Sequence, residues 1–330
     1  MQLPSTNSSP FDNFYRELLE KRSWFIIFQA IIGLITCTGA SIVLFLFYLT
    51  RKKFNSASMT SARKFFIALA TADFQSGIIL TPVLMNAAAT GLRVNDNFCV
   101  ESICLVSYTL LVTLFLLVTM TCDRYLAIFY PLKHRVHSKS GVTCFVIVAC
   151  YILGGILAFL CYLSRNLESP HPEVICFVSY ERISDSYSQP VILFVVFPSI
   201  FVFVVAYVRI FKAIRTSTKT VPKSMKNAEK IIIRRNTRKI LTGISAREVR
   251  ATLILFLTIL LFLLVWIPAP VGFIIYRYFP SYGSLNLGIA VLLCMQLNSM
   301  INPFLYARNI KNSRKLLMDC VVKRSFVPQI

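Results

Sequence analysis

The sequence predicts an all-α membrane protein: a seven-transmembrane-helix bundle followed by a short amphipathic cytoplasmic helix. Of the 330 residues, 56% are hydrophobic and only 15% are charged, whereas soluble domains carry roughly 25% charged residues. The apolar residues also fall into seven long stretches almost free of Lys, Arg, Asp and Glu. These two observations exclude a disordered chain, a collagen, a small disulfide scaffold and an ordinary cytosolic enzyme.

The seven stretches have the length of membrane-spanning helices. They cover residues 24–49, 65–90, 102–122, 141–164, 186–208, 251–276 and 278–307. Crossing the hydrocarbon core takes roughly 20 residues of helix, and a backbone in lipid must satisfy its own hydrogen bonds. Asp73 is the single charged residue inside a stretch. The alternating ten-residue segments typical of outer-membrane barrels are not seen.

The charges between the spans predict the orientation. If the amino terminus is outside, 28 of the 35 Lys and Arg residues lie on the inner side and 7 on the outer side. By the positive-inside rule, the carboxyl terminus is cytoplasmic. We therefore expect a multi-pass plasma-membrane protein with an extracellular amino terminus (1–23), a seven-helix domain (24–307) and a cytoplasmic tail with an amphipathic helix (308–330). The basic charge indicates inner-leaflet lipids and a cytoplasmic partner, not nucleic acid.

Several residues are candidates for covalent modification. Asn7 begins a glycosylation sequon on the predicted outer side. Cys99 and Cys176 also lie there, and we expect them to form a disulfide, with Cys104 as the competing partner. Cys320, among basic residues of the tail, is a candidate for palmitoylation, and a free thiol is the alternative.

Short motifs recur at the ends and in the middle of the spans. The second span contains Asp73, and the third leads into Asp123, Arg124 and Tyr125. The fifth span contains Pro198, and the sixth contains Phe262, Trp266 and Pro268. The seventh span ends with Asn302, Pro303 and Tyr306. In their order and placement, together with the Cys99 and Cys176 pair, they make the chain resemble the rhodopsin-like (class A) G-protein-coupled receptors. The resemblance covers roughly residues 24 to 320.

The resemblance implies a switch at the inner end of the bundle. Arg124 is expected to pair with Asp123 and Glu248 at rest and to contact a heterotrimeric G protein once the sixth helix swings outward. Simple snorkelling of Arg124 to lipid phosphates is the alternative. Tyr306 is expected to turn inward during activation. The residues implied to relay the change are Pro198, Phe262, Trp266, Pro268, Asn302 and Pro303, with a proline kink at Pro268.

The resemblance also implies a sodium site around the buried acid. Asp73, Thr113, Asn298 and Asn302 lie roughly 6 to 15 Å from the inner ends of their spans. They can share one oxygen-rich layer, which suits a hard cation. A hydrated network with protonated Asp73 is the alternative. Apart from this ion, no cofactor is expected.

The ligand pocket is expected between the third, fifth, sixth and seventh helices. Its candidate residues are Ser102, Val106, Ser107, Leu110, Phe194, Trp266, Ala269, Phe273, Leu292 and Gln296. Val106 stands at the position where amine receptors have an acidic residue. Gln296 stands where visual pigments have the lysine that binds retinal. Adenosine-type receptors have an Asn near the position of Phe273, and this chain has none there. These differences favour a neutral or lipid-like small ligand, with a short peptide as the alternative.

Some positions depart from the family pattern. Ala40 stands where the first helix usually has Asn, although Ser41 is a potential substitute, and the fourth span lacks its usual Trp. Tyr207 follows Pro198 by nine residues, where eight is usual, which puts its inward role in doubt.

The predicted function is a ligand-activated receptor that couples to G proteins, with arrestin and membrane lipids as further candidate partners. The alternative is a non-signalling receptor-like protein that modulates a partner by dimerising. A transporter is disfavoured because only Asp73 is a buried ionisable group. No catalytic constellation is visible, so the chain is not expected to be an enzyme. His134 and the other loop histidines are spaced like surface residues.

Overall fold

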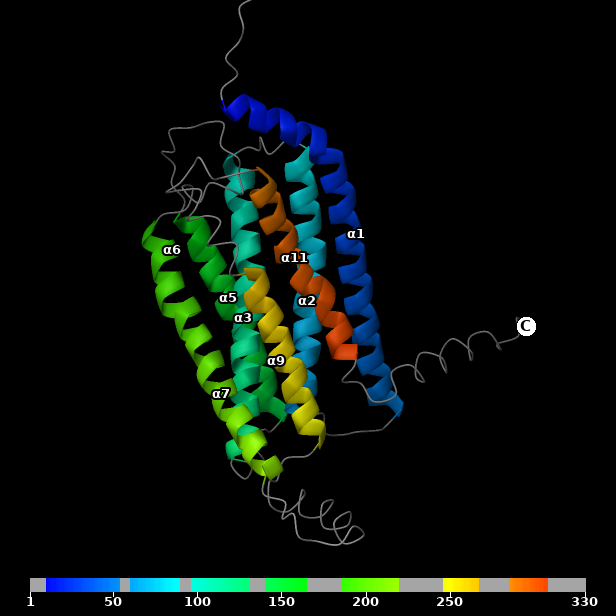
Figure 1. Ribbon diagram of the computed structural model, residues 1–330, viewed down its shortest axis with the longest axis vertical. Coiled ribbons are helices and arrows are strands. Elements are labelled where there is room, and N and C mark those ends of the chain that lie inside the picture. The colour runs from blue at the N-terminus through cyan, green and yellow to red at the C-terminus, as the bar shows by residue number, and fades with distance from the viewer. Residues whose placement is uncertain are drawn as a thin grey trace, which may run out of the picture.

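Every element in the described part of the computed structural model is a helix, and the helices run side by side as a bundle (Figure 1). The structure describes residues 10–53, 60–89, 96–130, 134, 140–164, 185–219, 246–266 and 285–307. Some side chains at helix ends, among them those of Glu248, Trp266 and Leu292, are not described. The helices are α1 (Pro10–Lys53), α2 (Ser61–Ala89), α3 (Asp96–Phe129), α5 (Ser140–Leu163), α6 (Asp185–Val191), η2 (Ile192–Val196), α7 (Phe197–Lys219), α9 (Ala246–Trp266) and α11 (Leu285–Ala307).

These helices confirm the predicted fold class. Five stretches are long and apolar enough to cross a membrane: Ser23–Thr50, Ser61–Asn86, Asn97–Phe129, Gly141–Leu163 and Gln189–Ala213. The fifth runs without a break from α6 through η2 into α7. The sixth and seventh predicted spans correspond to α9 and α11. The predicted tail helix lies outside the described residues.

The outward faces of the bundle are apolar. On α5, Phe145 is 74% exposed, and on α7, Phe201 is 69% exposed. Exposure of such large apolar surfaces to water would be unfavourable, whereas contact with lipid tails is favourable. The pattern of exposure therefore fits a bundle embedded in a membrane.

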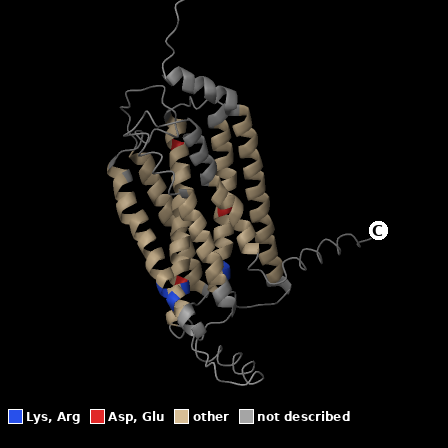
Figure 2. Ribbon diagram, in the orientation of Figure 1, with Lys and Arg blue, Asp and Glu red and all other residues tan. Residues whose placement is uncertain are grey.

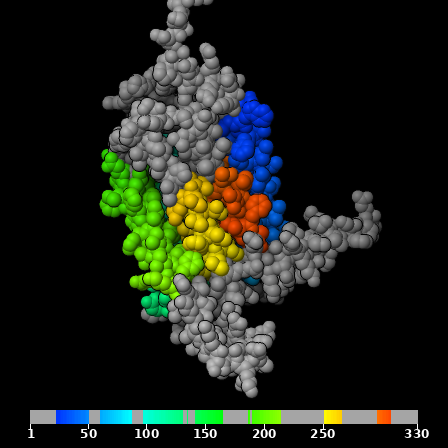
Figure 3. Space-filling model, viewed as in Figure 1, coloured from blue at the N-terminus to red at the C-terminus, as the bar shows by residue number. Residues whose placement is uncertain are grey.

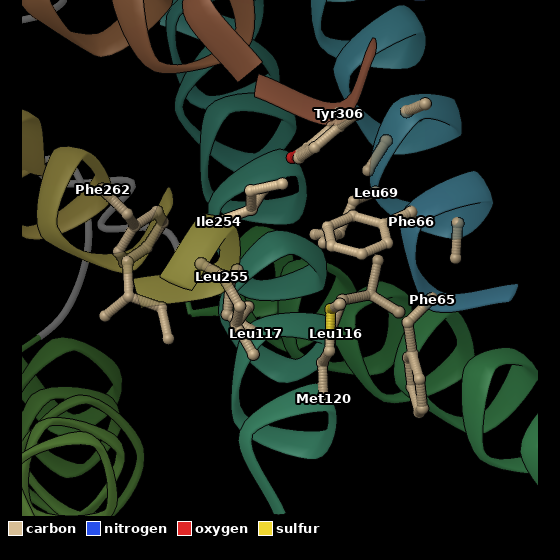
Figure 4. Close-up of a cluster of buried hydrophobic side chains, with 14 of the residues drawn as sticks. Phe65, Phe66, Leu69, Leu116, Leu117, Met120, Ile254, Leu255, Phe262 and Tyr306 are labelled. Carbon is tan, nitrogen blue, oxygen red and sulfur yellow. The ribbon is translucent and has the colours of Figure 1, made fainter. Parts of the chain in front are cut away.

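The main hydrophobic core contains buried side chains of α1, α2, α3, α5, α7, α9 and α11. Figure 4 shows Phe66 of α2, Leu116 of α3, Leu255 of α9 and Tyr306 of α11 converging on one cluster. Each of these four side chains is completely buried. On the face shown in Figure 3, α9 and α11 lie between α7 and α1, and α11 contacts both α9 and α1. The core therefore ties α9 to the other helices.

Small residues let several helices approach closely. A Cβ atom added at Gly33 of α1 would lie 2.5 Å from Cγ2 of Thr81 on α2. One added at Gly154 of α5 would lie 2.6 Å from Cγ2 of Val112 on α3. Close backbone approach through small residues is the usual means of helix association in membranes.

The basic side chains of the bundle gather at one end. Figure 2 shows the blue basic residues gathered at the end of the bundle where α3 ends. Among the side chains that the structure describes, the Lys and Arg residues are Arg63, Lys64, Arg124, Arg209 and Lys212. We call this end of the bundle the basic end.

Candidate functional site

The centre of the candidate site is an ion pair at the basic end of α3. Arg124 donates from Nε to Oδ2 of Asp123 over 3.1 Å, and its Nη2 contacts the same oxygen. The side chains of Arg124 and Asp123 are only 6% and 12% exposed. A guanidinium held so close to hydrocarbon is costly without a partner, and Asp123 supplies that partner. The other expected partner, Glu248, lies in the first turn of α9, and its side chain is outside the described ones.

Two further residues, Ser61 and His134, hold Asp123 in place. Ser61, at the start of α2, donates from Oγ to Asp123 Oδ1 over 2.6 Å. The same hydroxyl lies 3.3 Å from Oγ1 of Thr143 on α5. His134 places Nε2 2.9 Å from Asp123 Oδ1, and its side chain is only 18% exposed. The carboxylate therefore links α2, α3 and His134. His134 is half-buried, where its spacing in the sequence suggested a surface residue.

Tyr125 does not join this network. Its hydroxyl accepts a hydrogen bond of 3.0 Å from Nη1 of Arg209 on α7. Its ring lies 4.6 Å from that of Phe129, one turn further along α3. Tyr125 therefore connects α3 to α7 at the edge of the bundle.

Tyr207 of α7 points into the bundle, although its spacing from Pro198 put that in doubt. It is 4% exposed, and its ring centroid lies 5.2 Å from that of Phe256 on α9. The buried residues of α7 include Ser199, Phe203, Tyr207 and Ile210, which recur at helical spacing. Pro198 falls outside this face and is exposed.

Most of the described residues that are expected to relay activation are buried between the helices. Phe262, Asn302 and Pro303 are buried, and Phe262 belongs to the main core. Tyr306 is completely buried, its ring is 5.4 Å from that of Phe66, and Figure 4 shows its hydroxyl directed toward Ile254 of α9. The side chain of Trp266 and the whole of Pro268 lie outside the described residues.

Buried polar side chains lie on α2, α3 and α11. Asp73 of α2 is 1% exposed, and Nδ2 of Asn302 on α11 donates to its Oδ1 over 3.2 Å. Asp73 Oδ2, Asn298 Oδ1 and Asn302 Oδ1 are buried, with no hydrogen-bond partner within the described part of the chain. Thr113 of α3 is also buried. Buried oxygens without a partner are unfavourable, and carboxylate and amide oxygens are what a hard cation prefers, so these residues fit a sodium ion.

The structure describes the surroundings of two positions near the departures from the family pattern. Ala40 is completely buried, but Ser41 does not replace the missing amide, because it is exposed and donates to the Cys37 carbonyl of its own helix. On α5, the Tyr151 hydroxyl donates to the Ala68 carbonyl of α2 over 2.9 Å. Sequence reasoning missed this contact, because one tyrosine within an apolar span carries no pattern.

The residues expected to line the ligand pocket are only partly brought together. Ser102 is 1% exposed, and its hydroxyl donates to the Phe98 carbonyl within α3. Val106, Ser107 and Leu110 of α3 are half-buried. Gln296 of α11 is 4% exposed, and neither of its amide atoms has a hydrogen-bond partner among the described residues. Buried polar groups of this kind are typical anchors for a ligand.

Phe194 does not join these residues. It is 72% exposed and lies within the π-helical turn η2. A π-helical turn holds one residue more than an α-helical turn between bonded groups, so it changes which side chains face inward. Phe273 and Ala269 lie outside the described residues, as do the side chains of Trp266 and Leu292.

The predicted modification sites are only partly described. Cys99 is disulfide-bonded, and Cys104 carries a free thiol. Cys176 lies outside the described residues, so its pairing with Cys99 stays a prediction. Asn7 and Cys320 also lie outside them. In the described part of the chain, no three His, Cys, Asp or Glu side chains come together as a metal site.

Comparison with known proteins finds related sequences. Residues 39–306 match the model of the family described as 7 transmembrane receptor (rhodopsin family). The chain is 24% identical over 288 residues to the adenosine receptor A2a of Canis lupus familiaris, covering 82% of this chain and 67% of the relative. It is 26% identical over 315 residues to melanopsin of Podarcis siculus, covering 91% of this chain and 62% of the relative.

Proposed function

Because the chain belongs to the rhodopsin family of seven-transmembrane receptors, we propose that it binds an extracellular ligand and activates heterotrimeric G proteins by outward movement of α9. The family is one of membrane-embedded signalling receptors, not of enzymes. The observation that carries the proposal is the buried ion pair between Arg124 and Asp123 at the basic end.

The proposed orientation places the basic end in the cytoplasm. The described basic side chains gather at this end (Figure 2), and the positive-inside rule assigns such an end to the cytoplasmic side. The Arg124 switch would then face a G protein, and the opposite end would face the ligand.

In the proposed resting state, Arg124 is unavailable to a partner. Asp123 binds its guanidinium, while Ser61 and His134 fix the carboxylate. On α9, Ile254 and Leu255 are packed into the main core and are 6% and 0% exposed. Outward movement of α9 would remove these two side chains from the core and open a path to Arg124. Glu248, in the first turn of α9, would move with it.

The proposed ligand is a neutral or lipid-like small molecule. Val106 offers no counter-ion for an amine, while the buried amide of Gln296 offers a donor and an acceptor to a ligand. Neither adenosine nor retinal is proposed, since the chain lacks the asparagine and the lysine expected for those ligands. A short peptide is the competing class.

A sodium ion is proposed to stabilise the resting state. Asp73, Asn298 and Asn302 would supply its oxygen ligands, with Thr113 nearby. The support is the group of buried oxygens without a hydrogen-bond partner within the described residues.

Receptor activity can be tested without knowing the ligand. Cells expressing the full chain are screened for recruitment of each class of G protein, with and without a library of neutral small molecules and peptides. We expect Arg124→Ala to abolish basal and ligand-stimulated recruitment, while Arg93→Ala, which lies in the sequence between the second and third predicted spans, retains both. Equal recruitment by the two variants at matched surface expression would contradict the switch. No recruitment by the unaltered chain under any condition would favour the non-signalling alternative.

A further inference from the structure

A groove of about 490 Å³ lies between α3 and α5, far from the basic end. The two helices contact one another and run in opposite directions (Figure 1). The volume falls within the range of sites for small organic ligands, roughly 300 to 1,000 Å³. No residue lining it belongs to the ligand pocket expected between the third, fifth, sixth and seventh helices.

Each helix contributes one stripe of side chains to the groove. The stripe on α3 is Glu101, Cys104, Leu105 and Tyr108, and the stripe on α5 is Gly155, Ala158, Phe159 and Tyr162. Both follow the spacing of one helix face. Because the helices are antiparallel, Glu101 and Tyr162 share one end of the groove, and Tyr108 and Gly155 share the other, about 10 Å away.

Two neighbouring glycines explain why the groove exists. At Gly154 the helices touch, because an added Cβ would lie 2.6 Å from Val112 Cγ2. At Gly155, an added Cβ would have no described atom within 4 Å. The contact at Gly154 therefore fixes the inner limit of the groove, and the missing side chain at Gly155 leaves its floor open.

The groove opens sideways toward lipid. Leu105 and Phe159, one from each stripe, are 39% and 60% exposed, and both lie within membrane-spanning helices. An apolar molecule can therefore enter from the membrane without passing through the centre of the bundle.

The polar and aromatic side chains of the groove indicate which kind of ligand head group it can bind. Glu101 is exposed, and none of the side chains that the structure describes forms an ion pair with it. The rings of Tyr108, Phe159 and Tyr162 line the same space. A carboxylate next to aromatic rings favours a cationic nitrogen, through charge and through cation–π attraction. The remaining apolar lining suits an alkyl or aromatic body.

We propose that this groove is a lipid-accessible binding site for an amphiphile with a cationic amine head and an apolar body. The amine pairs with Glu101 between the aromatic rings, and the body lies along Leu105, Ala158 and Gly155. The site does not depend on G-protein coupling and is separate from the proposed ligand pocket.

The test uses the purified full chain in dodecyl maltoside, an uncharged detergent. The probe is dodecylamine with a diazirine in its chain, and the cross-linked residues are mapped by peptide mass spectrometry. Dodecanol and dodecyl sulfate with the same diazirine serve as neutral and anionic probes. We expect the amine to label the two stripes, and the other probes to label them roughly tenfold less, which corresponds to about 1.4 kcal/mol.

Matched variants separate the groove from general partitioning into detergent. Gly155→Leu fills the floor and is expected to reduce amine labelling roughly tenfold. Gly141→Leu is its control, because Gly141 lies on the same helix, outside the groove, and also has no described atom within 4 Å of an added Cβ. Glu101→Gln is expected to lower amine labelling to the level of dodecanol. Ala158→Leu replaces Gly155→Leu if the latter does not purify as a folded protein.

Two results would overturn the proposal. Unchanged amine labelling in the variant that fills the groove would show that the probe binds elsewhere. Equal labelling by the amine, alcohol and sulfate probes would show that Glu101 does not select a cation.

Discussion

Replacing Asp123 by Asn tests the Arg124 switch most directly. The substitution keeps the shape of the side chain and an oxygen that can accept from Ser61 or His134, but it removes the charge that holds Arg124. In the structure, Arg124 and Asp123 form an ion pair whose side chains are 6% and 12% exposed. We therefore expect Asp123→Asn to release Arg124 and raise basal signalling.

The size of the effect follows from the burial of the pair. A hydrogen bond to a charged group contributes about 1.5 to 3 kcal/mol, whereas an exposed ion pair contributes less than about 1 kcal/mol. Because the pair is nearly buried, we take the lower end of the first range, about 1.5 kcal/mol. A loss of this size shifts a two-state equilibrium slightly more than tenfold, since about 1.4 kcal/mol corresponds to a factor of ten. A receptor that is about 1% active at rest would then become about 11% active.

The assay is basal G-protein activation in living cells at matched surface expression. Glu17→Gln, the same kind of change in the segment before the first span, is the control and is expected to behave like the unaltered chain. If Asp123→Asn also leaves basal activation unchanged for every G-protein class that the unaltered chain engages, the Asp123 pair does not restrain Arg124 and the switch as described is wrong.

Three other predictions address different parts of the molecule. Glu248→Ala is expected to raise basal signalling by removing the second proposed partner of Arg124, and a drop in basal signalling at equal expression would argue against that role. Asp73→Asn is expected to abolish any effect of sodium on thermal unfolding of the purified receptor, measured against equal potassium, and a sodium effect that persists in the variant would rule out a site at Asp73. Gly33→Val is expected to lower the unfolding temperature, because its Cβ would lie 2.5 Å from Thr81 Cγ2. The control, Gly141→Val, should leave the unfolding temperature nearly unchanged, since an added Cβ there has no described atom within 4 Å. Equal unfolding temperatures for the two variants would contradict the close approach of α1 and α2.

The architecture could be predicted because a membrane limits the choices so strongly. A backbone in lipid must be helical, and the charge-free runs marked the spans within a few residues, as with 24–49 against Ser23–Thr50. The contact of Arg124 with Asp123 and that of Asp73 with Asn302 also agree with what the motifs indicated.

The rest could not be predicted because it depends on how helices face one another. The outward position of Phe194 accompanies a π-helical turn that no sequence period indicates. His134 contacts Asp123, and a histidine between two predicted spans carries no sign of such a contact in the sequence. Ser61 and Tyr151 are single hydroxyl groups whose partners lie on other helices, so only the assembled bundle reveals them.

The close contacts on one side of the bundle limit where flexibility can reside. Gly33 joins α1 to α2, Gly154 joins α5 to α3, and the Tyr151 hydroxyl joins α5 to α2. A sliding motion among these four helices would drive side chains into backbone or break a hydrogen bond with no water to replace it. They should therefore serve as a stationary frame, and hydrogen exchange should be slowest there and fastest in α7 and α9.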